Sequence, residues 1–410
     1  MPTPLAVPTG RPRLGVLPGF LAALSPLSQL GFTPVAVVLG DRLGLSVGQV
    51  GLTVGIYAAA AAAATLVLGP LFDLVSPRRV LPVAVAANVV LSASLLLEPG
   101  FAGILVSRVL SGLTNSALML CASVVVADAN RGDGTARERG FSRLQTFTSL
   151  GAVAGLGVGA TAAGLGAPQV WSWTVVGYGL VVLALTPAIS RRLPAALPGV
   201  AGAGPGARVS AVLREVGAAL RVPRTALLLV AAAGVGWAIQ AAHYAVSLLS
   251  EQLHPPLWQR VLLAVMIPAG VFLGSSANQV LLGRRSAARV FSRAYPALPV
   301  SCAVLALVVG AGGGWGVVAL LTTLVVLGAV LGTLMPLSPA VLVGWHPGLR
   351  GSVTAADSVA KGLGSTVSPV VLGAVAAATS LGAGFLVLAA VAALAAVCAR
   401  AATPGPPQRG

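Results

Sequence analysis

Charged side chains are scarce in this chain. Only 8% of its 410 residues are charged, while 57% are hydrophobic; in a soluble protein roughly a quarter of the residues are charged. Such a sequence lacks the polar surface that a water-soluble domain of this length needs. The 51 glycines, together with many alanines, suit helices that pack closely in lipid. The composition therefore predicts an all-α, polytopic membrane protein.

Histidine and cysteine are also rare. The three His and three Cys residues are scattered along the chain, so they form neither a disulfide framework nor the ligand spacing of a metal site. We expect no metal and no other cofactor. An enzyme of the membrane would need a cluster of His, Asp and Glu residues, which the sequence does not contain, so this class is the least favoured.

Acidic residues are outnumbered, and the formal net charge is +16. Basic proteins often neutralise nucleic-acid phosphates, but here the Arg residues recur in short clusters between apolar runs. This distribution argues against a nucleic-acid partner. It follows instead the positive-inside rule, by which loops rich in Arg remain in the cytoplasm.

The apolar runs are long enough to cross a bilayer, which takes about 20 helical residues. We predict twelve spans near 14–39, 46–70, 80–97, 102–127, 144–163, 170–189, 225–250, 257–282, 294–310, 315–338, 352–376 and 381–399. The corresponding organisation is a tail (1–13), a six-helix bundle (14–190), a linker (191–224), a second bundle (225–399) and a second tail (400–410).

The two bundles are expected to be pseudo-symmetric. A shift of 213 residues aligns 136–160 with 349–373, with Arg137 on Arg350 and small residues on small residues. Repeats of this kind are typical of secondary transporters. The linker begins with a Pro/Gly/Ala stretch and continues with an amphipathic pattern over 209–221, which indicates a short helix at the membrane surface.

The Arg clusters predict the orientation. If the N-terminus is cytoplasmic, one side of the membrane holds Arg78, Arg79, Arg131, Arg137, Arg139, Arg143, Arg191, Arg192, Arg208, Arg214, Arg221, Arg224, Arg284, Arg285, Arg289, Arg293 and Arg350. The other side keeps little beyond Arg42 and Arg260. We therefore expect a multi-pass protein of the plasma (inner) membrane, with both termini in the cytoplasm.

The loop between the second and third spans reads GPLFDLVSPRRVL, residues 69–81. It resembles the signature loop of the major facilitator superfamily, roughly G-x-L-x-D-R-x-G-R-R, with Leu74 and Ser76 at two departures from that pattern. The matching positions that bear on gating are Gly69, Asp73, Arg78 and Arg79. The resemblance implies that Asp73 latches the two bundles at the start of the eleventh span. The alternative is that the loop only sets topology, with the Arg pair as positive-inside charge.

Two further motifs support the resemblance. RVLSGLTNSA in the fourth span is similar to the R-x-x-Q-G pattern, with Ser111 in place of Gln. GAVAGLGVGA, residues 151–160, is similar to the antiporter pattern that ends G-P-x-x-G-G, with Leu156 and Ala160 as departures. GLSVGQVGLTVGIY, residues 44–57, and WSW, residues 171–173, resemble the bacterial twelve-span drug and metabolite efflux branch, for which proton antiport is the family expectation.

Arg108 is the deepest charge of the first bundle. It shares one helical face with Ser111 and Asn115, and in this superfamily the fourth span lines the central cavity. The expected cavity residues are Gln29, Thr33, Arg108, Ser111, Asn115, Trp237, Gln240 and Tyr244. The alternative for Arg108 is that its side chain extends to the outer headgroups.

The candidates for coupling to ions are Arg108, His243, Asp357 and Lys361. Asp357 and Lys361, the only lysine of the chain, are spaced for a helical ion pair, which is either a structural device or part of the transport path. His243 could exchange a proton near neutral pH or could be held by a hydrogen bond alone.

These features favour a secondary active transporter that exports a small drug-like molecule or metabolite, with a proton as the coupled ion. We expect it to act as a monomer in the lipid bilayer. Two alternatives stay open: uptake of an organic anion by symport, for which Arg108 and Lys361 are suited, and a receptor or scaffold that uses the same fold without transport.

The orientation can be tested on the linker. A single cysteine introduced within 191–224, in a chain whose three native cysteines are replaced, should not react with a membrane-impermeant thiol reagent in intact cells, because the linker is expected to be cytoplasmic. It should react after the cells are opened. Labelling in sealed cells would contradict the assignment of spans.

Overall fold

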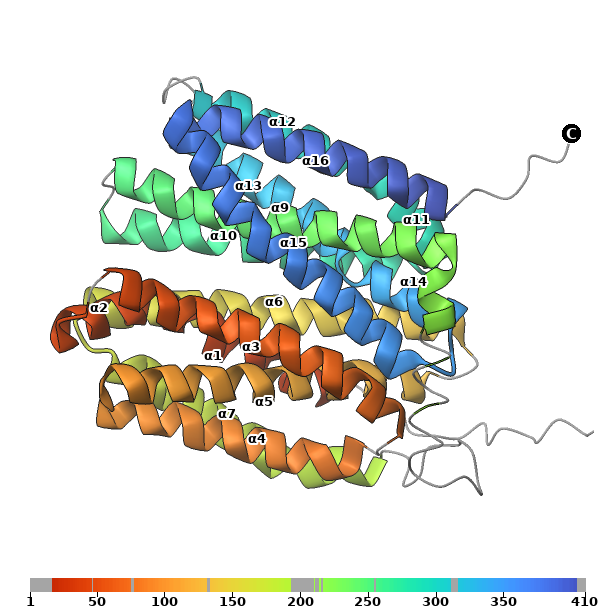
Figure 1. The fold of residues 1–410 in the computed structure, drawn as a ribbon, viewed down its shortest axis with the longest axis horizontal. Helices are drawn as coiled ribbons and strands as arrows, with labels where there is room; N and C mark the ends of the chain where they lie inside the picture. The colour runs from red at the N-terminus through yellow and green to blue at the C-terminus, as the bar shows by residue number, and fades with distance from the viewer. Residues whose placement is uncertain are drawn as a thin grey trace, which may run out of the picture.

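The computed structural model describes residues 17–45, 47–74, 77–130, 133–192, 217–253, 256–310 and 316–403, together with Ser210 and Arg214. Every regular element in these ranges is helical. The helices form two bundles that lie one above the other in Figure 1. Most of the linker predicted at 191–224 lies outside the described residues.

The first bundle consists of seven α-helices and one short 3₁₀-helix among the described residues. They are α1 (Leu17–Leu30), α2 (Phe32–Leu43), α3 (Val47–Leu74), α4 (Pro77–Ser94), η1 (Leu95–Leu97), α5 (Gly100–Ala129), α6 (Gly134–Gly164) and α7 (Gln169–Arg192).

The second bundle follows the linker. It contains α9 (Pro223–Leu253), α10 (Leu257–Leu281), α11 (Ala287–Ala294), α12 (Ala297–Gly310), α13 (Gly316–Leu334), α14 (Leu337–Trp345), α15 (Arg350–Ala378) and α16 (Leu381–Ala402).

The prediction of an all-α polytopic membrane protein is confirmed. Nine helical segments of the described residues are long and apolar enough to cross a membrane. Each predicted span overlaps one helix or two consecutive helices, but α1, α2, α3 and α15 are not among the nine. The count of twelve spans therefore stays a prediction.

Three predicted spans are broken rather than continuous. The first is divided at Gly31, between α1 and α2, and another at Met335 and Pro336, between α13 and α14; the span near 294–310 is divided at Tyr295 and Pro296, between α11 and α12. Trp171 and the backbone of Gly155 lie directly against Gly31, so the first break lies where α6 and α7 approach the chain most closely. The second break leaves carbonyls at the end of α13 without helical partners.

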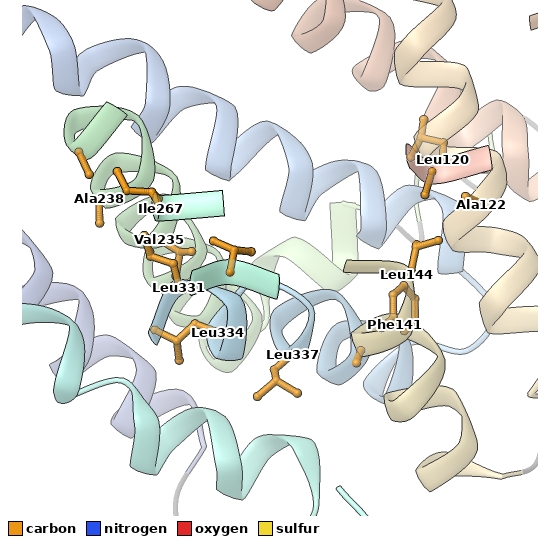
Figure 2. Packing of buried hydrophobic residues seen from close by; sticks show 14 of the residues in the cluster. Leu120, Ala122, Phe141, Leu144, Val235, Ala238, Ile267, Leu331, Leu334 and Leu337 are labelled. Atoms are coloured by element: carbon orange, nitrogen blue, oxygen red, sulfur yellow. The ribbon is translucent and has the colours of Figure 1, made fainter. Parts of the chain in front are cut away.

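Each bundle has an apolar interior. The buried apolar residues form one cluster that extends through both bundles. Figure 2 labels Leu120, Ala122, Phe141 and Leu144 from the first bundle and Val235, Ala238, Ile267, Leu331, Leu334 and Leu337 from the second. Because lipid is as apolar as these side chains, close packing holds the helices together in the membrane.

Glycines make the closest crossings. Gly151, Gly155 and Gly159 of α6 lie against the backbone of α1 and of Gly31. Gly270 and Gly274 of α10 lie in the same way against α13. A Cβ atom at any of these positions would meet a backbone atom of the neighbouring helix.

The bundles touch each other mainly through two helix pairs, α6 with α10 and α3 with α15. Figure 1 shows α15 crossing obliquely between α9 and α3. Thr146 of α6 donates a hydrogen bond to Ser275 of α10 (3.0 Å), and Gln279 donates one to Thr146 (3.3 Å). The central interface therefore contains polar groups.

The glycine crossings can be tested in α10. In Gly274→Ala the new methyl group would overlap the carbonyl oxygen of Ala329, and overpacking of this kind costs roughly 1–3 kcal/mol. We expect a lower unfolding temperature in detergent, measured by tryptophan fluorescence. The control is Gly177→Ala, at an exposed position of α7 with no heavy atom near the new methyl. Equal losses in both variants would contradict the crossing.

Candidate functional site

Arg108 lies inside the first bundle, between two aromatic rings. Its guanidinium carbon is 4.1 Å from the ring centre of Phe32 and 4.7 Å from that of Tyr57, and its Nε donates to the carbonyl of Thr53 (3.4 Å). Arg108 is only 2% exposed. Cation–π contacts are worth about 2 kcal/mol or more when desolvated, so the rings compensate part of the cost of burying this charge.

A chain of amide and hydroxyl groups lies on the same face of α5. Asn88 Nδ2 donates to Asn115 Oδ1 (3.0 Å), and Asn115 Nδ2 donates to Ser28 Oγ (3.1 Å). All three residues are buried. The chain joins α1, α4 and α5, and it fixes the α5 face that carries Arg108.

The predicted cavity residues divide into two groups. Arg108, Ser111 and Asn115 are together on α5 and buried, and on the first span Gln29 is half-buried while Thr33 is exposed. Trp237 and Gln240 are half-buried on α9 in the other bundle, and the side chain of Tyr244 lies outside the described residues. Their role as substrate ligands stays a proposal.

Asp357 and Lys361 form an ion pair on α15. Lys361 Nζ donates to Asp357 Oδ2 (2.6 Å) and to the carbonyl of Met335 (2.8 Å), at the break between α13 and α14. Side-chain exposure is 3% for Asp357 and 16% for Lys361. The ion pair expected from the i, i+4 spacing is present, and Lys361 also contacts the chain between α13 and α14. His243 is half-buried on α9, and its coupling role stays a prediction.

The signature loop is only partly described. The side chains of residues 69–77, including Asp73, lie outside the description, so the predicted latch stays a hypothesis. Arg78 donates to the carbonyl of Arg191 (3.2 Å) at the end of α7, which ties the loop to its own bundle. Arg79 is exposed. The two Arg side chains therefore have different surroundings.

A contact between the bundles involves residues that the sequence analysis used for topology or did not name. At the start of α6, the carboxylate of Glu138 lies close to the N–H of Ala287, the first residue of α11. Arg137 lies against Gly344, and Arg139 against Gly283. Three successive residues of the first bundle thus contact three segments of the second.

We call this end, where α6 and α15 begin, the Arg-rich end. Its described Arg residues include Arg78, Arg79, Arg137, Arg139, Arg191, Arg224, Arg284, Arg285, Arg289 and Arg350. At the opposite end, Arg42 pairs with Glu98 (2.9 Å) and Gln169 donates to Glu98 (3.0 Å). Those contacts stay within the first bundle. The described polar contacts therefore link the bundles at the Arg-rich end and along α6 and α10.

The sequence profile of the Major Facilitator Superfamily matches residues 19–322. The chain belongs to this superfamily. It is a multi-pass membrane protein of a family of transporters, and the resemblance seen in its motifs is confirmed at this level. No curated protein sequence matches the chain.

Solved structures of transporters share the fold. The chain aligns with FucP in its outward conformation (14% identity, 95% of this chain and 98% of that one, TM-score 0.72). It also aligns with a variant of the E. coli fucose:proton symporter FucP (14%, 96% and 100%, 0.71). The human organic anion transporter MFSD10 gives 18% identity, 94% and 97% coverage and a TM-score of 0.70. At these identities the likeness shows the fold alone.

The contact at Glu138 predicts a change in access to the interface. The attraction between a carboxylate and the first N–H groups of a helix contributes up to about 2 kcal/mol where it is partly buried, so Glu138→Gln should open the Arg-rich end more often. A cysteine at Ser275, which is fully buried against Thr146, should then react roughly tenfold faster with a thiol reagent. The control is Glu98→Gln at the opposite end. Unchanged labelling in Glu138→Gln would show that Glu138 does not hold this end closed.

Proposed function

We propose that this protein is a secondary active transporter that moves a small, negatively charged organic molecule across the plasma membrane. The observation that carries the proposal is the burial of Arg108. Among the described residues no carboxylate forms an ion pair with the Arg108 guanidinium, whose contacts are two aromatic rings and a backbone carbonyl. A charge kept inside a membrane protein without such a partner is functional by default.

The surroundings of Arg108 suit an anionic ligand. A guanidinium holds its charge at any working pH and offers donors in a fixed fork that fits a carboxylate or phosphate. Phe32 and Tyr57 cover it in this conformation, in which it is 2% exposed. A substrate would reach it when these rings move, and Ser111 and Asn115 on the same face would then add polar contacts.

Alternating access of the two bundles about a midplane site is the general mechanism of such folds. Support comes from the uneven distribution of polar contacts: at the Arg-rich end Glu138 lies close to the N–H of Ala287 in the second bundle, whereas Arg42 and Glu98 form an ion pair within the first. In our proposal these contacts at the Arg-rich end break when the site opens to the cytoplasm, where the positive-inside rule places both termini. The transporter acts as a monomer, since one chain supplies both bundles.

Two directions of transport follow from different observations. Uptake coupled to a proton is favoured by the buried cation and by two relatives in fold, which are a fucose:proton symporter and an organic anion transporter. Export by proton antiport is favoured by α6, where Gly155 and Gly159 match the antiporter pattern and pack directly on α1 and Gly31.

The role of Arg108 can be tested after a screen for substrates. Cells with and without the protein are compared for growth on organic acids and for resistance to toxic compounds, and the solute found is followed in proteoliposomes. Arg108→Ala should abolish transport because the charge that binds the anion is lost. Arg108→Lys should retain part of it, since the charge remains without the fork.

The matched control is Arg400→Ala, at an exposed position in the last turn of α16. It should transport at the wild-type rate, and all variants should yield similar amounts of folded protein. Normal transport by Arg108→Ala would refute the anion site. If the wild-type protein moves no solute under any ion gradient, a receptor or scaffold role is favoured instead.

A further inference from the structure

One oxygen of a buried carboxylate is left without a partner. Asp357 is 2% exposed, and its Oδ2 accepts from Lys361. Among the described residues, its Oδ1 has no hydrogen-bond partner. Buried polar atoms in native proteins are almost always hydrogen-bonded, so an exception calls for an explanation. An oxygen in this situation can accept a proton.

We propose that Asp357 binds the coupled proton and that its protonation releases Lys361 to hold the negative group of the substrate. The inference rests on the proposed transport of an organic anion and names a second element of that site. The proton bonds to Oδ1, the carboxylate becomes a neutral acid, and the attraction between Asp357 and Lys361 is lost. The ammonium is then available as a counter-ion.

Charge balance inside the membrane determines how many protons bind together with the anion. An unneutralised charge in a low-dielectric interior is costly. The pair of Asp357 and Lys361 is neutral, but a proton alone would leave the ammonium without a counter-charge. An anion alone would compete with the carboxylate for the same ammonium. At this pair, a proton and one negative charge of the substrate together restore neutrality, so they bind together and cross the membrane in the same direction; a negative charge that faces Arg108 is additional to this count. The pair therefore favours symport over antiport.

The pair is also connected to a break in the helices. Lys361 donates to the carbonyl of Met335 (2.8 Å), which lies just beyond the last residue of α13. From there, α14 runs to Gly344, against which Arg137 of the first bundle lies. When Lys361 leaves the carbonyl, the break loses a hydrogen bond, and the angle between α13 and α14 can change. Proton binding thereby acts on a segment that touches the closed Arg-rich end.

Other ionisable groups on neighbouring helices do not replace Lys361. The helices packed on α15 are α3, α5, α9, α14 and α16. Their described ionisable side chains, with that of the residue after α14, are Tyr57, Arg108, Cys121, Arg224, His243, His346, Cys398 and Arg400. Asp73, Asp128, Tyr244 and Glu251 have side chains outside the description. Within the described residues, Lys361 is the one that forms an ion pair with Asp357.

The only lysine of the chain makes a direct test feasible. Protein labelled with ¹⁵Nζ-lysine and ¹³Cγ-aspartate gives one ammonium signal, from Lys361. Solid-state NMR in lipid then measures the dipolar coupling between Lys361 Nζ and the carboxyl carbon of Asp357. We expect strong coupling at neutral pH, and its loss at mildly acidic pH in the presence of benzoate, a simple organic anion. Circular dichroism verifies that the helices persist.

Coupling that persists at acidic pH with benzoate would overturn the inference, because the pair would then be a structural device. This measurement needs no transport substrate, so its failure leaves the proposed function standing. Conversely, a wild-type protein that transports no solute refutes the proposed function whatever the NMR result.

Variants test the same inference in proteoliposomes. Asp357→Asn should still exchange the solute found in the screen but should not accumulate it with a proton gradient; Glu98→Gln, the control, should do both. If Asp357→Asn leaves Lys361 uncompensated and fails to fold, the double variant Asp357→Asn, Lys361→Gln removes both charges. It should fold and lose proton-driven accumulation. Proton-driven accumulation by either folded variant would contradict the role of Asp357.

Discussion

The structure depends on helices that approach one another to backbone contact inside lipid. No hydrophobic force drives helices together there, so the stability comes from van der Waals packing and from hydrogen bonds between helices. The closest approaches are glycine positions: Gly159 of α6 against Gly31, Gly274 of α10 against Ala329, and Gly364 of α15 against Ala233 of α9. The small residues that dominate the composition are therefore the residues that permit the fold.

Such close packing determines how the few internal charges are accommodated. Arg108 and Asp357 are each 2% exposed, so each charge needs a compensating group within reach. Arg108 obtains two aromatic faces and a backbone carbonyl, whereas Lys361 obtains a carboxylate and a carbonyl. The surroundings of Arg108 leave the first bundle with a positive charge that an anion can neutralise. The pair of Lys361 and Asp357 is neutral and changes its charge only when a proton binds.

The fold class and the positions of the helices could be predicted from the sequence, because length and apolarity alone define segments that cross a bilayer. The spacing of Asp357 and Lys361 likewise predicted a pair that the structure contains. The breaks at Gly31 and Met335 were not predicted, since both lie within continuous apolar runs whose interruption depends on packing against other helices. For the same reason the rings of Phe32 and Tyr57 were missed: nothing in their local sequence indicates that they meet around Arg108.

Glu138 shows where local sequence ceases to be informative. It stands among Arg residues in ARERGF, a context that indicates a solvated cytoplasmic segment. Its partner, the N–H of Ala287, lies at the start of a helix in the other bundle, where unsatisfied N–H groups favour a negative charge. Only the three-dimensional arrangement brings them together. A contact of this kind suits the proposed transport mechanism, because a single electrostatic contact with flanking van der Waals contacts can break and re-form while the glycine crossings within each bundle stay intact. The backbone-to-backbone contacts of these glycines thus lie within the bundles, an arrangement that suits the proposed alternation of two bundles about a shared site.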